Sequence, residues 1–147
     1  MRDRIRPPKD LEDILDRLKE DKVFDTKQKG MMFAAAVGYN LHRDKVGSAE
    51  IETVGEAIKM EYFERPDDVG FIDALAVTTQ NDLGIVSDER LPERIDLFEK
   101  YALLGLKEMK RACYDEKPEY PLYGILKLID QIDRPEAGGL PGLEGLL

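Results

Sequence analysis

The chain has 147 residues, of which 42% are hydrophobic and 36% are charged; these values are typical of one globular domain and exclude a largely disordered protein. The net charge of −9 is uneven, because residues 1–45 carry +2 and residues 46–147 carry −11, and so acidic a body disfavours non-specific DNA binding by the whole surface. The single cysteine excludes an internal disulfide and a zinc site built from several cysteines.

The chain opens with a short basic segment in which Arg2, Arg4 and Arg6 alternate. In an extended strand these three side chains share one face, and Pro7-Pro8 prevent a helix from starting earlier. An amphipathic helix is predicted next, because apolar residues recur at helical spacing at Leu11, Ile14, Leu15 and Leu18.

A second helix is predicted to begin near Asp25 or Thr26, where Asp25 and Gln28 fit a capping box. Its segment Met31–Tyr39 (MMFAAAVGY) is apolar on nearly every face, and its three alanines favour the close approach of another helix. We therefore expect this helix to be central, and to end in the polar run from Asn40 to Lys45.

Residues 46–65 carry two patterns. Ile51, Val54 and Ile58 have helical spacing, whereas the apolar residues of 58–62 alternate as in a strand. The segment Ile58–Phe63 is predicted to be extended.

Three further helices are predicted in the second half of the chain. Pro66 fits the first turn of a buried helix that reaches Thr79, and a turn follows at Asn81–Gly84. Pro92 opens the longest helix, which reaches about Cys113. The last helix follows Pro121, with apolar positions at Leu122, Ile125, Ile129 and Ile132.

Together these elements predict a mainly α fold: a compact bundle of about five helices, with one short β element near residues 58–63 and an extended N-terminal strand. Residues 1–133 are expected to form one helical domain. Residues 134–147 (RPEAGGLPGLEGLL) are rich in Gly, Pro and Leu and are expected to form a flexible tail. No apolar run approaches the roughly 20 residues that span a bilayer, and the opening residues lack a secretory signal, so a cytoplasmic protein is expected.

The sequence contains no recognisable catalytic, cofactor-binding or metal-binding pattern, and an enzyme is not expected. His42 is the only histidine and is predicted to lie in an exposed loop, without the neighbours that a metal site needs. Cys113 lies toward a helix C-terminus, where the helix dipole opposes thiolate formation, so a half-buried structural thiol is expected. The carboxylates of Asp67, Asp68 and Asp88 fit helix N-termini better than a magnesium site.

The basic start indicates a candidate DNA contact. A strand followed by two helices matches the ribbon–helix–helix layout, in which a strand paired between two chains enters the major groove and arginine bonds guanine. This alternative describes a small regulatory DNA-binding module, acting as a homodimer. Its candidate contacts are Arg2, Arg4, Arg6, Lys9, Lys27 and Lys29.

Three segments resemble the fourth family of Dnd-associated proteins. The first is MMFAAAVGYNLHRDK, which resembles that family's MFAAALGY segment and the basic residues that follow it. The second is FIDALAVTTQNDLGIVSDE, which resembles the family's apolar helix and acidic turn. The third is LFEKYALLGLKEM, which resembles the family's IFEEYANGGLEIL helix. The resemblance covers about residues 4–112. Leu103 and Leu104 stand where the family has Asn-Gly, which makes this helix more apolar.

The resemblance implies an accessory protein encoded beside bacterial DNA phosphorothioation and restriction genes, with no catalytic residue to carry over. Our first functional hypothesis is therefore a non-enzymatic adaptor in a modification or restriction system of anti-phage defence, which binds a protein subunit of that system. Its candidate partner contacts are Met31, Met32 and Phe33, wherever these are exposed. No cofactor and no membrane partner are expected.

Overall fold

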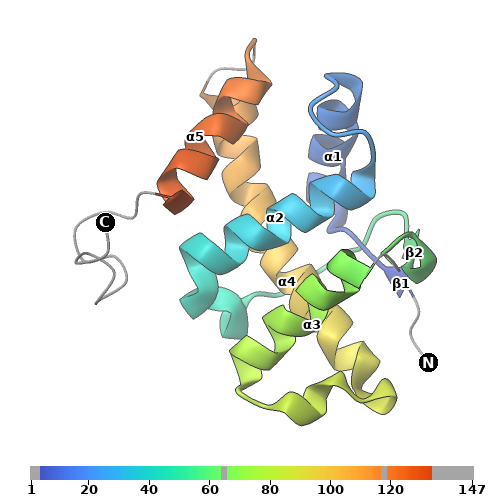
Figure 1. Cartoon of the computed structure of the whole chain (residues 1–147). Helices are drawn as coiled ribbons and strands as arrows, with labels where there is room; N and C mark the ends of the chain where they lie inside the picture. Colours follow the sequence, from blue (N-terminus) through green and yellow to red (C-terminus); the bar gives the residue numbers. More distant parts are fainter. Residues whose placement is uncertain (1–3, 64–65, 117–118, 134–147) are drawn as a thin grey trace, which may run out of the picture.

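Two long helices cross at the centre of the molecule, and the other elements pack around them (Figure 1). The computed structural model describes residues 4–63, 66–116 and 119–133. Its helices are α1 (Glu12–Glu20), α2 (Lys27–His42), α3 (Pro66–Gln80), α4 (Leu91–Lys110) and α5 (Pro121–Asp133), and its strands are β1 (Arg4–Ile5) and β2 (Ile58–Lys59). The structure therefore confirms the mainly α bundle and its short β element.

Short helical turns connect these elements. Turns of 3-10 type occupy Lys9–Leu11, Arg43–Ser48, Met60–Phe63, Leu83–Val86 and Asp88–Arg90. A π-helical turn, Arg111–Asp115, directly follows α4. The predicted tail, residues 134–147, lies outside the described residues, as does Arg2.

Helices α2 and α4 touch through their backbones, because each has a glycine at the crossing. A Cβ atom placed on Gly105 would lie 1.7 Å from the carbonyl oxygen of Ala34, and one on Gly38 would lie 2.0 Å from that of Tyr101. Only glycine permits so close an approach. The small residues of the second helix do predict this central position, and Ala34 and Ala35 are fully buried.

The start of α2 differs from the predicted capping box. The Thr26 side chain caps the helix by accepting a hydrogen bond from the Lys29 N–H at 3.2 Å. Gln28 instead donates from Nε2 to the Asp68 carboxylate, at 2.6 Å, and so ties α2 to the first turn of α3. The sequence has the residue types of a capping box, but Gln28 forms a tertiary contact with Asp68 and does not cap the helix.

Strands β1 and β2 form an antiparallel pair in which Arg4 lies opposite Lys59 and Ile5 opposite Ile58. The predicted extended segment at residues 58–63 is therefore strand only at Ile58–Lys59. It turns at Met60 because Phe63 is drawn into the core, where its ring meets that of Phe98 edge to face at 5.8 Å.

A buried arginine secures the loop between α3 and α4. The Arg94 guanidinium lies 2.9 Å from the Asp73 carboxylate of α3. It also donates hydrogen bonds to the backbone carbonyls of Ile85 and Ser87. A charge this deeply buried is tolerated because the carboxylate and both carbonyls face it.

Candidate interaction surfaces

Helix α5 has two apolar faces, and only one of them is covered. Ile125 and Leu128 are buried against the rest of the molecule, and Gly124 approaches the π-helical turn so closely that a Cβ atom there would lie 2.4 Å from the Ala112 carbonyl oxygen. The opposite face, together with Tyr120 just before the helix, carries large hydrophobic side chains that are 38–65% exposed: Tyr120, Leu122, Tyr123, Leu126 and Ile129. We call these five residues the outer α5 face.

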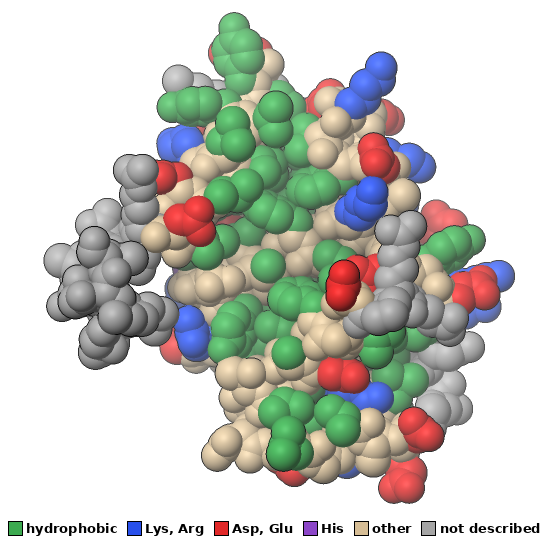
Figure 2. All heavy atoms as spheres, viewed as in Figure 1, with side chains coloured by type: hydrophobic (Ala, Val, Ile, Leu, Met, Phe, Trp, Pro, Cys, Tyr) green, Lys and Arg blue, Asp and Glu red, His purple; other side chains and the backbone are tan. Residues whose placement is uncertain are grey.

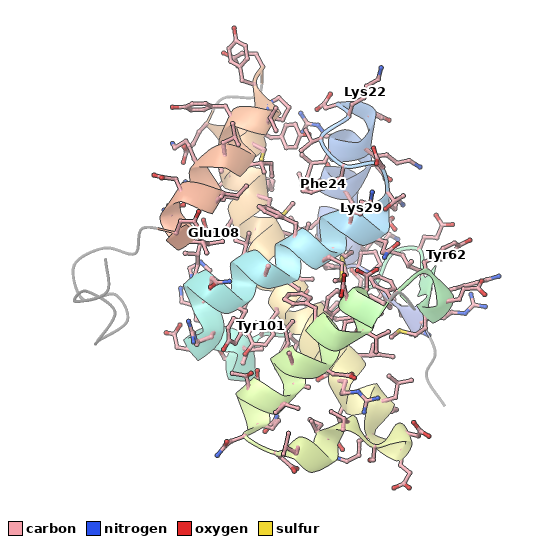
Figure 3. The ribbon with its side chains drawn as sticks, viewed as in Figure 1. Lys22, Phe24, Lys29, Tyr62, Tyr101 and Glu108 are labelled. Atoms are coloured by element: carbon pink, nitrogen blue, oxygen red, sulfur yellow. The ribbon has the colours of Figure 1, made fainter. Side chains whose placement is uncertain are left out.

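A groove runs along the start of the outer α5 face. Its walls are the first turns of α5 and the turn that follows α1, and its volume is about 500 Å³. We call it the α5 groove, and it is lined by Asp21, Val23, Glu119, Tyr120, Pro121, Leu122, Tyr123 and Leu126. Figure 2 shows hydrophobic side chains gathered over α5 and over the space between α5 and α1, and Phe24 lies in that space (Figure 3).

The charged residues of the α5 groove are acidic. Asp21 and Glu119 line it, and no Lys or Arg is among the lining residues that the structure describes. Lys22, next to Asp21, points away from α5 (Figure 3). Asp21 accepts a hydrogen bond from the Tyr114 hydroxyl at 2.9 Å, and burial together with this carboxylate raises the pKa of Tyr114, which stays a neutral donor.

The flank of α5 that faces the π-helical turn is more mixed. It holds a hollow of about 330 Å³ lined by both charges, at Arg111, Lys127 and Asp130, besides Tyr123 and Leu126. These charges are partly satisfied within the chain, since Arg111 and Lys127 both contact Glu116. This hollow is therefore less apolar than the α5 groove.

The sequence predicts that His42 lies in an exposed loop, and this prediction is wrong. It is the last residue of α2, and its Nε2 lies 2.7 Å from the Glu108 carboxylate of α4. Arg111 also donates to Glu108, at 2.7 Å. Burial alone would raise the pKa of Glu108, but the hydrogen bonds from Arg111 and His42 outweigh it and lower that pKa. The cluster joins the ends of α2 and α4.

Cys113 is fully buried in the π-helical turn, deeper than the half-buried thiol that the sequence predicts. Burial raises its pKa to about 11. A thiol held in this state is a poor nucleophile and a poor metal ligand. Across residues 4–63, 66–116 and 119–133, no group of three or more His, Cys, Asp or Glu side chains is placed to hold a metal ion.

The candidate DNA-contact residues divide between two places. Arg4, Arg6 and Lys9 are exposed near β1, while Ile5 between the two arginines is fully buried. The Arg6 backbone N–H donates to the buried carboxylate of Glu99 at 2.6 Å, which fixes this segment against α4. Lys59, opposite Arg4, adds a further exposed cation to the same face of the ribbon.

Lys27 and Lys29 lie instead at the start of α2, beside carboxylates. Lys27 Nζ is 3.0 Å from Asp16 and within 4 Å of Glu12 and Glu56. Burial lowers its pKa, but these carboxylates outweigh that effect and raise it. Lys29 pairs with Asp25 at 3.1 Å. Their charge is therefore largely compensated within the chain.

The candidate partner contacts differ in their exposure. Met31 is fully buried, whereas Met32 and Phe33 are half-buried, and the Phe33 ring packs on that of Phe24 at 5.5 Å. Sequence patterns do not single out the outer α5 face, although one signal is present. The segment PLYGILKLID holds more apolar residues than a single helix stripe can bury.

None of the helices in the described part of the chain is long and apolar enough to cross a membrane. A family model described as DNA sulphur modification system-associated protein 4 matches residues 4–137. The match extends through α5, beyond the segments on which the sequence resemblance depends. Comparisons with curated proteins and with solved structures give no match.

Proposed function

Because the chain belongs to the family of DNA sulphur modification system-associated protein 4, we propose that it serves such a system as a non-enzymatic adaptor. In this proposal it binds another protein of the phosphorothioation-linked modification or restriction machinery, and so contributes to anti-phage defence. The outer α5 face is the contact surface. The observation that carries the proposal is that large hydrophobic side chains cover both sides of α5, but only one side is buried.

The exposed apolar residues are grouped on one helix, which favours a binding role. Leu122, Leu126 and Ile129 are spaced at i, i+4 and i+7, so they form a continuous stripe. Contiguous exposed apolar surface of this kind marks interaction sites on proteins. Neither reactive side chain named above competes with this role, since Cys113 is buried and His42 is bound to Glu108.

The adaptor proposal is tested by co-expressing the tagged chain with each protein of the sulphur modification system. We expect at least one of them to co-purify with the wild type, and to be lost from a Leu122→Ser, Leu126→Ser double variant. Leu83→Ser is the matched control, because Leu83 is 77% exposed but lies in the loop before α4. Co-purification that the double variant retains, or none with any protein of the system, refutes the proposal.

The exposed cations of the β ribbon support a second candidate function, contact with duplex DNA. Arg4 and Lys59 lie opposite each other in the ribbon, Arg6 follows β1 and is exposed, and Lys59 has Glu61 at 4.0 Å. Arginines presented by a β ribbon can bond guanine in the major groove. The strand pairs within one chain, so this candidate does not need the dimer of the ribbon–helix–helix layout.

The DNA candidate is tested by fluorescence anisotropy with plain and phosphorothioated duplexes over a range of salt concentrations. Binding that weakens with salt and is lost in an Arg2→Ala, Arg4→Ala, Arg6→Ala variant supports it, whereas a Lys27→Ala, Lys29→Ala variant is expected to bind normally. Each lost phosphate contact should reduce the slope of log K against log salt by about 1. Absence of binding at low salt removes this candidate.

A further inference from the structure

We propose that the occupant of the α5 groove is an amphipathic helix of another protein, with a leucine-like apolar stripe flanked by Lys or Arg. The inference rests on the adaptor function proposed above and specifies the chemistry of the partner. It draws on the shape of the groove, its apolar lining and the sign of its charge.

The shape and lining of the groove fit a helix. Tyr120, Leu122, Tyr123 and Leu126 form an apolar wall along the first turns of α5, and Val23 faces it from the turn after α1. An amphipathic helix binds such a groove through apolar side chains spaced at i, i+3, i+4 and i+7. The two tyrosines bring large apolar rings with polar hydroxyls, and such residues are enriched at protein interfaces.

The charge of the groove selects basic flanks on that helix. Asp21 and Glu119 line the groove, and no described Lys or Arg lines it. Residues 46–147, which include the α5 wall, carry a net charge of −11. Complementary charge speeds the encounter with a basic partner, and like charge placed across an interface opposes binding.

The same charges disfavour two occupants from the chain itself. The tail, residues 134–147, contains Glu136 and Glu144 against Arg134, so it would bring further negative charge to an acidic groove. A second copy would bring the same acidic groove and a net charge of −9. A separate partner with basic flanks is the occupant that complements the surface.

Two labelled model peptides with the same Leu stripe, one flanked by Lys and one by Glu, test the inference by fluorescence anisotropy on the full chain. We expect the Lys peptide to bind and the Glu peptide to bind at least about tenfold more weakly at low salt. Asp21→Asn with Glu119→Gln should weaken the Lys peptide by about tenfold and reduce its salt dependence. Leu122→Ser with Leu126→Ser should abolish binding.

Matched variants separate the groove from general surface effects. Two control variants change the same residue types outside the groove: Leu83→Ser, and the double variant Asp88→Asn with Glu89→Gln. Both should bind the Lys peptide as the wild type does. Circular dichroism confirms that each variant is folded. Equal binding of both peptides, or no binding of the Lys peptide, overturns the inference.

Two further outcomes assign the groove to another occupant and also overturn the inference. One is self-association in sedimentation equilibrium that the Leu122→Ser, Leu126→Ser variant abolishes. The other is peptide binding without charge preference that appears only after truncation at Asp133. If a protein of the system co-purifies through the outer α5 face while the Lys peptide fails, the adaptor function stands and only the partner's chemistry is refuted.

Discussion

The carboxylate of Glu108 joins two helices through hydrogen bonds from His42 and Arg111. The sequence predicts a loop at His42, because the partner of this residue lies 66 residues away and no local pattern marks the pair. Cys113 was easier to interpret, since a lone cysteine is usually buried and the position near a helix C-terminus opposes a thiolate. Single residues are thus predictable where chain neighbours decide their environment, and unpredictable where a distant helix does.

The lowered pKa of Glu108 makes stability depend on pH. A carboxylate whose folded pKa is depressed stabilises the fold above its ordinary pKa of 4.5, and this contribution is lost as pH falls through the folded pKa. We expect Glu108→Gln to lower the free energy of unfolding at neutral pH by about 1–3 kcal/mol. It should also flatten the dependence on pH below 4.5.

Urea unfolding followed by circular dichroism, at neutral pH and at several acidic values, measures both effects. Glu89→Gln is the control, because Glu89 is exposed in the turn before α4. A variant that loses stability in acid as steeply as the wild type would show that Glu108 does not contribute.

The buried thiol of Cys113 should resist modification in the folded protein. Its pKa of about 11 leaves almost no thiolate near neutral pH, and full burial blocks access. We expect Ellman's reagent to react with the native chain only at the rate of unfolding, and rapidly in denaturant. Prompt reaction of the native protein would contradict the buried position.

Helices α2 and α4 depend on glycine where their backbones meet. Gly105→Ala places a methyl group against the Ala34 carbonyl, which cannot move without displacing α2. We expect this variant to lose about 3 kcal/mol of unfolding free energy, or to fail to fold, because a packed backbone crossing cannot accept the added volume. Gly38→Ala should behave alike, since its methyl group would meet the Tyr101 carbonyl.

Gly70→Ala is the matched substitution. Gly70 lies within α3, is exposed, and has open space where a Cβ atom would stand. Alanine should stabilise that helix by about 0.5–1 kcal/mol, because glycine loses more backbone entropy on folding. Chemical denaturation of the three variants gives the comparison, and effects of the same sign at Gly70 and Gly105 would refute the close crossing.

Most helices were predictable because their apolar spacing and prolines are local signals. α3 begins at Pro66 and α4 contains Pro92 in its first turn, as expected. The details that failed depend on tertiary contacts. Gln28 leaves the capping box for Asp68, and β2 ends early because Phe63 turns into the core. The outer α5 face was missed because both sides of that helix are apolar, and only packing decides which one is buried.

One hydrophobic core connects the described part of the molecule. It includes Ile5 of β1, Leu18 of α1, Phe63, Phe98 of α4 and Leu128 of α5. Elements that share one core lose their packing together when it opens. Length and composition predict a single domain, but they do not predict which helices cross.

Thermal unfolding should therefore be a single cooperative transition. We expect the midpoint from far-ultraviolet circular dichroism to coincide with that from tyrosine fluorescence, which is usable because the chain has 6 tyrosines and no tryptophan. The calorimetric enthalpy should equal the van't Hoff enthalpy. An earlier transition confined to one probe would show that a helix such as α5 melts separately.

Helices α2 and α4, which meet at Gly38 and Gly105, are synthesised at different times on the ribosome. The face of α2 at Gly38 needs the chain at Gly105 to cover it. At about 5–20 residues per second, that partner is made about 3–13 s later. During this interval the small-residue face of α2 and the apolar MMFAAAV segment emerge uncovered. The nascent chain therefore holds α2 without its native packing partner until α4 has been synthesised.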